Sequence, residues 1–143
     1  MEAKEKFIRD RQSDNKTNLK HMETNFIKDN SIINFTLVDQ QKAIGYGAKT
    51  SKQAVLENVN YNELVKLLGH PTFSTPSLDE KVQVEWVMRI NGHTVTIYDY
   101  KTYDREHTIN RLSVWSVGGD DWETCDELVN MIHENLNKET EQL

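Results

Sequence analysis

The stretch VEWVMRINGHTVTIYDYK, residues 84–101, predicts a β-hairpin. Its centre, Asn91-Gly92, suits a two-residue type I′ turn, because both positions of that turn need a positive φ. A turn at this point places Trp86 opposite Ile97. Strand alternation then puts Asp99 on the same face as these two apolar side chains. The hairpin therefore predicts a carboxylate at the rim of an otherwise apolar layer.

Asp99 has two possible roles in such a layer, because a buried carboxylate is costly unless it is paired or hydrogen-bonded. It could accept hydrogen bonds from backbone amides of a neighbouring loop, or pair with an arginine such as Arg111. Alternatively, it could be a polar anchor at the mouth of a ligand pocket. A single carboxylate is not an acid/base pair, so it does not by itself indicate hydrolysis.

The segments on either side of the hairpin predict an α+β fold. The β-branched run SIINFTLV predicts a strand near residues 31–38, and RLSVWSV predicts another near 111–117, ended by Gly118-Gly119. Helices are predicted near 60–68 and 121–136. The first has a capping box, Asn60 with Glu63, and the second an apolar stripe, Trp122, Cys125, Leu128, Val129, Ile132 and Leu136. A small antiparallel sheet packed against two helices follows.

The rest of the chain is expected to connect or extend this core. Residues 1–30 are polar and predict an N-terminal arm that is partly mobile or helical. Residues 39–54 predict a loop, and 101–110 a mobile polar link. A single domain is therefore expected over 31–137, followed by a frayed tail over 138–143.

Composition excludes several classes of function. The formal net charge of −6 argues against general binding to nucleic acid, which needs a positive surface. The one cysteine, Cys125, cannot form an intramolecular disulfide, and the histidines show no metal-ligand spacing. The charged N-terminus does not look like a signal peptide, and no apolar run is long enough to span a membrane. We therefore expect a cytoplasmic, intracellular protein with no metal, cofactor or catalytic constellation.

A small-ligand site is one functional possibility. Aromatic faces beside a cation could stack a nucleotide base and hold its phosphates. The residues that would form this site are Asp99, Tyr98, Tyr100, Arg111 and Trp115. The competing interpretation of the aromatic residues is a second, lightly covered layer of the core.

A partner-binding surface is the other possibility. Residues 120–143 hold eight Asp or Glu against the single Lys138, so the negative charge is concentrated on the last segment. This distribution is typical of a solvated helix face, but it also suits an acidic surface offered to a basic partner protein. The residues that would form the surface are Asp120, Asp121, Asp126, Glu127 and Glu134. An exposed edge strand could also pair with a second copy, so a homodimer is possible.

The order of these elements resembles small proteins of tailed phages and large DNA viruses. The resemblance covers roughly residues 61–132 and rests on Glu85-Trp86, on TIYDYK at 96–101, and on WSVGG at 115–119. It implies a viral origin and a compact α+β fold, and it implies no reaction. Combined with the acidic last segment, it suggests a viral accessory factor that engages or inhibits a host protein.

Overall fold

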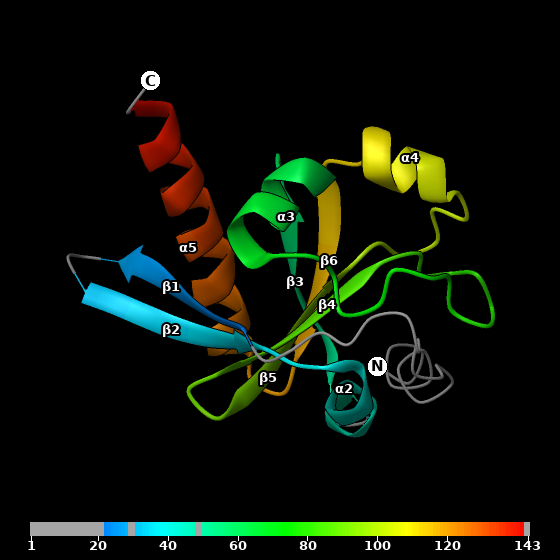
Figure 1. The fold of residues 1–143 in the computed structure, drawn as a ribbon, viewed down its shortest axis with the longest axis horizontal. Coiled ribbons are helices and arrows are strands. Elements are labelled where there is room, and N and C mark those ends of the chain that lie inside the picture. The colour runs from blue at the N-terminus through cyan, green and yellow to red at the C-terminus, as the bar shows by residue number, and fades with distance from the viewer. Residues whose placement is uncertain (1–21, 29–30, 48–49, 142–143) are drawn as a thin grey trace.

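The computed structural model describes residues 22–28, 31–47 and 50–141 and shows an α+β fold (Figure 1). Its strands form one six-stranded antiparallel sheet, which has more strands than the sequence predicted. In chain order the elements are β1 Met22–Lys28, β2 Ser31–Leu37, α2 Gln40–Gly47, β3 Ser51–Glu57, α3 Tyr61–Leu68, β4 Glu85–Ile90, β5 His93–Tyr98, α4 Arg105–Asn110, β6 Val114–Gly119 and α5 Trp122–Glu141.

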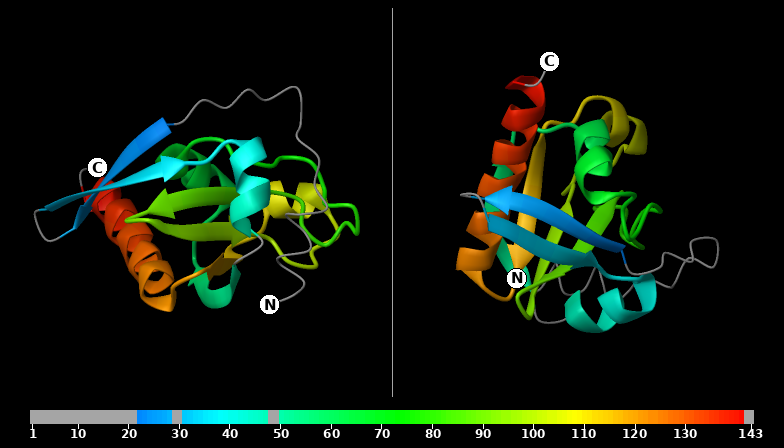
Figure 2. Two further views of the ribbon diagram at one scale, coloured as in Figure 1. Left: turned by 90° about the horizontal axis from the view of Figure 1, so that it is seen from below. Right: turned by 60° about the vertical axis from the view of Figure 1, so that its left-hand side comes forward.

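The strand order in the sheet is β1-β2-β4-β5-β6-β3. On one face, here called the core face, α3 and α5 contribute the apolar side chains Leu64, Leu68 and Leu128 to the main core. On the opposite face, here called the second face, Ala43 of α2 packs with Val87 of β4. Figure 2 shows α2 and α5 on opposite sides of the strands. Both faces of the central hairpin are therefore covered, and its residues are almost all buried.

Two tryptophans form the centre of the core face. Trp86 of β4 is fully buried, and its indole N–H donates to the carbonyl of Gly69 at 2.9 Å. Trp115 of β6 meets it edge to face, with ring centroids 5.7 Å apart. This geometry is the one that aromatic quadrupoles favour. The indole hydrogen bond also fixes the end of α3 to the sheet.

The hairpin register predicted from the turn is confirmed. Trp86 lies opposite Ile97, and the turn residues Asn91 and Gly92 have φ values of 50° and 81°. The capping box at the start of α3 is also present, with both hydrogen bonds formed between Asn60 and Glu63. In each case the prediction succeeded because a local backbone requirement selects few residue types.

The predictions for residues 1–30 and 39–54 need correction. Residues 22–28 are strand β1, which pairs along its length with β2, and not part of a mobile or helical arm. Residues 1–21 lie outside the described part of the chain. The expected loop at 39–54 contains helix α2 and most of β3, which joins the sheet beside β6.

Two further corrections concern the C-terminal half. The expected mobile link at 101–110 contains helix α4, whose N-cap Asp104 accepts hydrogen bonds from two backbone amides. Gly118 and Gly119 do not end their strand but belong to β6. A Cβ at Gly119 would lie 2.5 Å from the sulfur of Cys125 and 2.8 Å from the carbonyl oxygen of Thr94. Glycine is needed there because α5 and β5 approach the backbone closely.

Candidate functional site

Asp99 lies just after β5 and is fully buried. One carboxylate oxygen accepts from the backbone amides of Gln83 at 2.8 Å and Val84 at 2.9 Å. The other accepts from the hydroxyls of Thr102 at 2.7 Å and Thr108 at 2.8 Å. The carboxylate thus receives four hydrogen bonds from within the protein. This is the first of the two roles considered for Asp99, in which it accepts hydrogen bonds from backbone amides of a neighbouring loop. Asp99 therefore joins the loop before β4 to α4 and presents no oxygen to a ligand.

Tyr98 and Tyr100 remain together on the second face. Their rings meet edge to face with centroids 6.3 Å apart. Tyr98 is buried, and burial, reinforced by the neighbouring Tyr100 phenol, raises the pKa of its hydroxyl. Tyr100 is partly exposed, and the ammonium of Lys101 lies 5.4 Å from its ring centroid. This pair can stack against a planar group, but it forms only part of the predicted ligand site.

Trp115 and Arg111 lie away from this pair, which corrects the predicted ligand site. Trp115 is on the core face, and its indole N–H donates to the carbonyl of Val59 at 2.7 Å. Arg111 follows α4 and is exposed, beside a shallow polar hollow that it shares with Asp104, Glu106 and His107. The five predicted side chains therefore do not meet at one place. Strand parity puts Trp115 on the opposite face of the sheet from Tyr98, and Arg111 lies at the polar hollow after α4.

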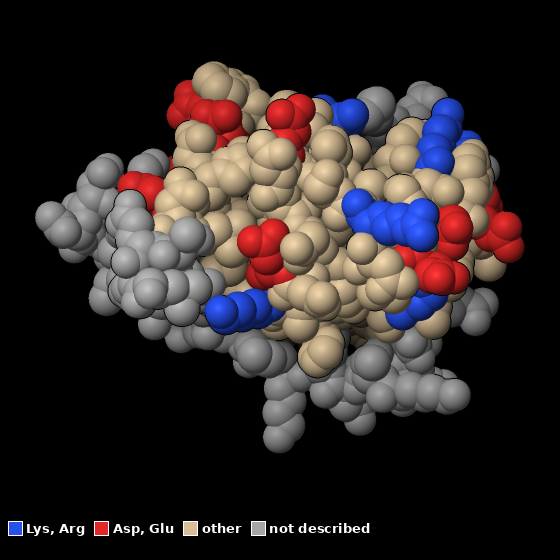
Figure 3. Space-filling model, turned by 90° about the horizontal axis from the view of Figure 1, so that it is seen from above, with Lys and Arg blue, Asp and Glu red and all other residues tan. Residues whose placement is uncertain are grey.

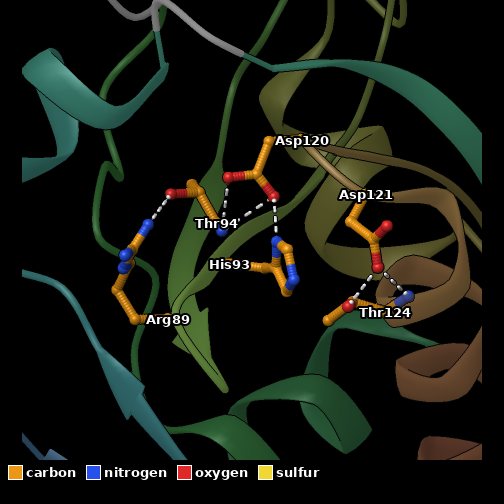
Figure 4. A network of polar contacts seen from close by, with 6 residues as sticks. All are labelled: Arg89, His93, Thr94, Asp120, Asp121 and Thr124. Carbon is orange, nitrogen blue, oxygen red and sulfur yellow. Dashed lines mark hydrogen bonds and ion pairs between the residues drawn. The ribbon is translucent and has the colours of Figure 1, made fainter.

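Asp120 and Asp121, predicted to bind a partner, are engaged within the protein (Figure 4). Asp120 accepts from the backbone amide of Thr94 at 3.3 Å and lies 3.1 Å from the His93 ring nitrogen Nδ1. Asp121 caps α5, accepting from the hydroxyl of Thr124 at 2.6 Å and from its amide at 3.1 Å. These hydrogen bonds, with a smaller contribution from His93, lower the pKa of Asp121. Asp120 therefore links the end of β6 to β5, and Asp121 caps the first turn of α5.

The pair of His93 and Asp120 was not anticipated, because the residues are distant in sequence and meet only through the pairing of β5 with β6. A histidine with a carboxylate can serve in acid/base chemistry when a nucleophile is near. The nearby thiol, Cys125, is buried, and burial followed by the charges of Asp120 and Asp121 raises its pKa to about 12. A thiol that stays protonated is a poor nucleophile. The geometry therefore favours a structural role for the pair.

The exposed surface at the start of α5 is the strongest feature of the predicted acidic segment. Trp122 is 62% exposed and does not belong to the apolar stripe, which corrects its predicted position. Glu123 and Asp126 are exposed beside it, and Asp126 is one helical turn further along the same face. Glu127 and Glu134 are half-buried. An exposed indole thus lies among carboxylates that point into solvent.

Charge elsewhere on the surface is mixed. On the face shown in Figure 3, acidic and basic side chains lie next to one another at the right-hand end, where α4 lies in Figure 1. Within the described residues, no group of three or more His, Cys, Asp or Glu side chains could hold a metal ion. The same part of the chain contains no helix of the length and apolarity that a bilayer crossing needs.

Comparison with protein-family models, with curated proteins and with solved structures finds no match to this chain. The site at the start of α5 therefore has to be interpreted from its own chemistry.

Proposed function

We propose that this protein is a non-enzymatic binding protein that holds a basic segment of a partner protein against the start of α5. The observation that carries the proposal is the 62% exposure of Trp122 beside Glu123 and Asp126. Tryptophan is enriched among the residues that dominate binding energy at interfaces. An indole flanked by carboxylates suits arginine, whose guanidinium stacks on an aromatic face while pairing with an acid.

The resemblance to phage and large-virus proteins supports a more specific version of this function. In that version the protein is a viral accessory factor, and the basic partner is a host protein in the cytoplasm of the infected cell. The proposal gives the acidic last segment a role and needs no catalytic group. It also narrows the predicted surface, because Asp120 and Asp121 are used internally and Trp122 takes the central position.

The test is quantitative capture from host-cell lysate by the immobilised full chain. Trp122→Ala and the pair Glu123→Gln with Asp126→Asn should each release the same captured proteins. The loss expected for a central anchor is about 2 kcal/mol, a roughly thirty-fold weaker affinity. The capture should also weaken at high salt, because its ion pairs are near the surface.

The matched control is the pair Glu80→Gln with Glu106→Gln, which removes the same charge from exposed positions outside α5. This control should capture as the wild type does. Capture that survives both the Trp122 change and the loss of the two α5 charges would rule out the proposed surface.

A further inference from the structure

The last strand of the sheet, β3, has a neighbour on one side only. It pairs with β6 and ends the strand order, so its other edge is unpaired with any strand in the described residues. Val55 at its centre is 43% exposed, and Lys52, Gln53 and Glu57 are also exposed. Open edges of this kind are sites at which another strand can add to a sheet.

A bulge in β3 gives this edge an unusual arrangement of side chains. Lys52 lies opposite Gly118, Val55 opposite Ser116 and Glu57 opposite Val114, and the register shifts between Lys52 and Ala54. Gln53 is therefore an extra residue in the strand. As a result, Lys52, Val55 and Glu57 all belong to the second face, on the opposite side of the sheet from α5. Val55 lies midway between a positive and a negative side chain.

The backbone of Val55 points away from β6. The Asp120 N–H donates to the carbonyl of Thr94 in β5, so by alternation Trp115 faces β3, and its opposite residue, Leu56, faces β6. The carbonyl of Glu57, the next residue of β3, therefore faces outward, and it lies 2.7 Å from Nε2 of His133 in α5. Carbonyls two residues apart in a strand point the same way, so the amide and carbonyl of Val55 also face outward. In the described part of the chain, no hydrogen bond from an element outside the sheet occupies the Val55 amide or carbonyl.

We propose that β3 pairs antiparallel with β3 of a second copy, about a two-fold axis at Val55. In this register the Val55 backbone exchanges two hydrogen bonds with Val55 of the partner subunit. Because Gln53 is the extra residue of the bulge, the second ladder position on that side of Val55 is Lys52. Lys52 then lies opposite Glu57 of the partner subunit, and Glu57 lies opposite Lys52 of the partner subunit. The six-stranded sheet becomes continuous across the dimer.

A second copy suits this edge better than an unrelated strand, because the edge is complementary to itself. A two-fold axis at Val55 places Val55 against its own counterpart and reverses the direction of the second strand, so the positive end of one strand meets the negative end of the other. Val114, which is 49% exposed on the same face, extends the apolar strip beside Val55. The register is thus specified by charge at both ends and by apolar contact in the middle.

Sedimentation of the full chain over a range of concentrations tests the proposal. Wild type should change from monomer to dimer as concentration rises. Lys52→Glu places Glu opposite Glu, and Glu57→Lys places Lys opposite Lys. Each variant alone should therefore have a dimer dissociation constant at least about tenfold higher than that of the wild type. An equimolar mixture of the two variants restores both opposite-charge pairs, and it should form a heterodimer.

Val55→Pro tests the backbone pairing separately. Proline is tolerated at an edge where the N–H faces outward, so the fold should persist while the dimer is lost. Lys66→Glu, an exposed change on α3, should leave the dimer intact. A wild type that stays monomeric, a dimer that survives Lys52→Glu and Val55→Pro, or a variant mixture that fails to associate would each overturn the proposal. Circular dichroism of every variant confirms that the chain is folded.

Discussion

The carboxylate of Asp99 and the hydroxyl of Thr108 are joined by a hydrogen bond of 2.8 Å between two fully buried side chains. Thr108 is the only buried residue of α4. The bond therefore fixes a six-residue helix that is too short to be stable alone. This hydrogen bond, together with the one from Arg105 to the carbonyl of Ser74, holds α4 in its place in the fold.

Replacing Asp99 by Ala should lower the free energy of unfolding by about 3 kcal/mol, because the amides of Gln83 and Val84 would then be buried without an acceptor. Asp99→Asn should cost less, since its amide oxygen can still accept from both backbone groups. Thr108→Val should cost about 1 kcal/mol and loosen α4. Urea denaturation gives the three values. Equal losses for Ala and Asn at position 99 would contradict this account of the carboxylate.

Gly119→Ala should destabilise the protein by about 2–3 kcal/mol, because the added methyl group has no room between β5 and α5. Its nearest neighbour would be the Cys125 sulfur, 2.5 Å away. Combining Gly119→Ala with Cys125→Ala should therefore recover part of the loss, and the remainder reflects the fixed carbonyl of Thr94. A double-mutant cycle from denaturation curves measures the coupling. Strictly additive effects would show that the sulfur is not the obstacle.

The three tryptophans should differ in both stability and fluorescence. Trp122→Ala should change the free energy of unfolding by less than about 1 kcal/mol, because most of the side chain is in solvent. Trp86→Ala should cost about 3–5 kcal/mol, because it empties the centre of the core. Acrylamide should quench one component of the native emission, and Trp122→Phe should remove that component. Quenching that persists in Trp122→Phe would mean that a buried indole is accessible.

Stability should fall at alkaline pH through Cys125. Burial raises the pKa of its thiol from 9.0 to about 12, so the unfolded chain loses this proton before the folded chain does. The contribution to stability is complete below about pH 9 and is lost as the pH rises toward 12. Denaturation curves between about pH 8 and pH 10.5 should show this decline, and Cys125→Ala should flatten it. Tyr98, whose pKa is also raised, leaves a residual slope.

The sequence was most informative where a short backbone motif leaves few choices. Asn91-Gly92 fixed the hairpin and its register, and Asn60 with Glu63 fixed the start of α3. Strand β3 was missed because the extra residue Gln53 breaks the alternation that identifies a strand. Helix α4 was missed because its six residues are too few to show a helical periodicity, and its position depends on a tertiary contact of Thr108.

The candidate site was less predictable than the fold, because exposure depends on how helices rotate against the sheet. Helical periodicity placed Trp122 on the apolar stripe, whereas it lies at the first turn and extends into solvent. The roles of Asp120 and Asp121 depend on contacts with β5 and with the first turn of α5. The first contact joins residues more than twenty positions apart, and no periodicity in the sequence records it.

The pairing of β3 with β6 has a consequence for synthesis on the ribosome. Residues 51–57 leave the ribosome well before residues 114–119, their neighbours in the finished sheet. At about 5–20 residues per second, several seconds pass before β6 exists. Throughout that interval β3 lacks its intramolecular neighbour. Both edges of the β3 segment are then open to pairing with another strand.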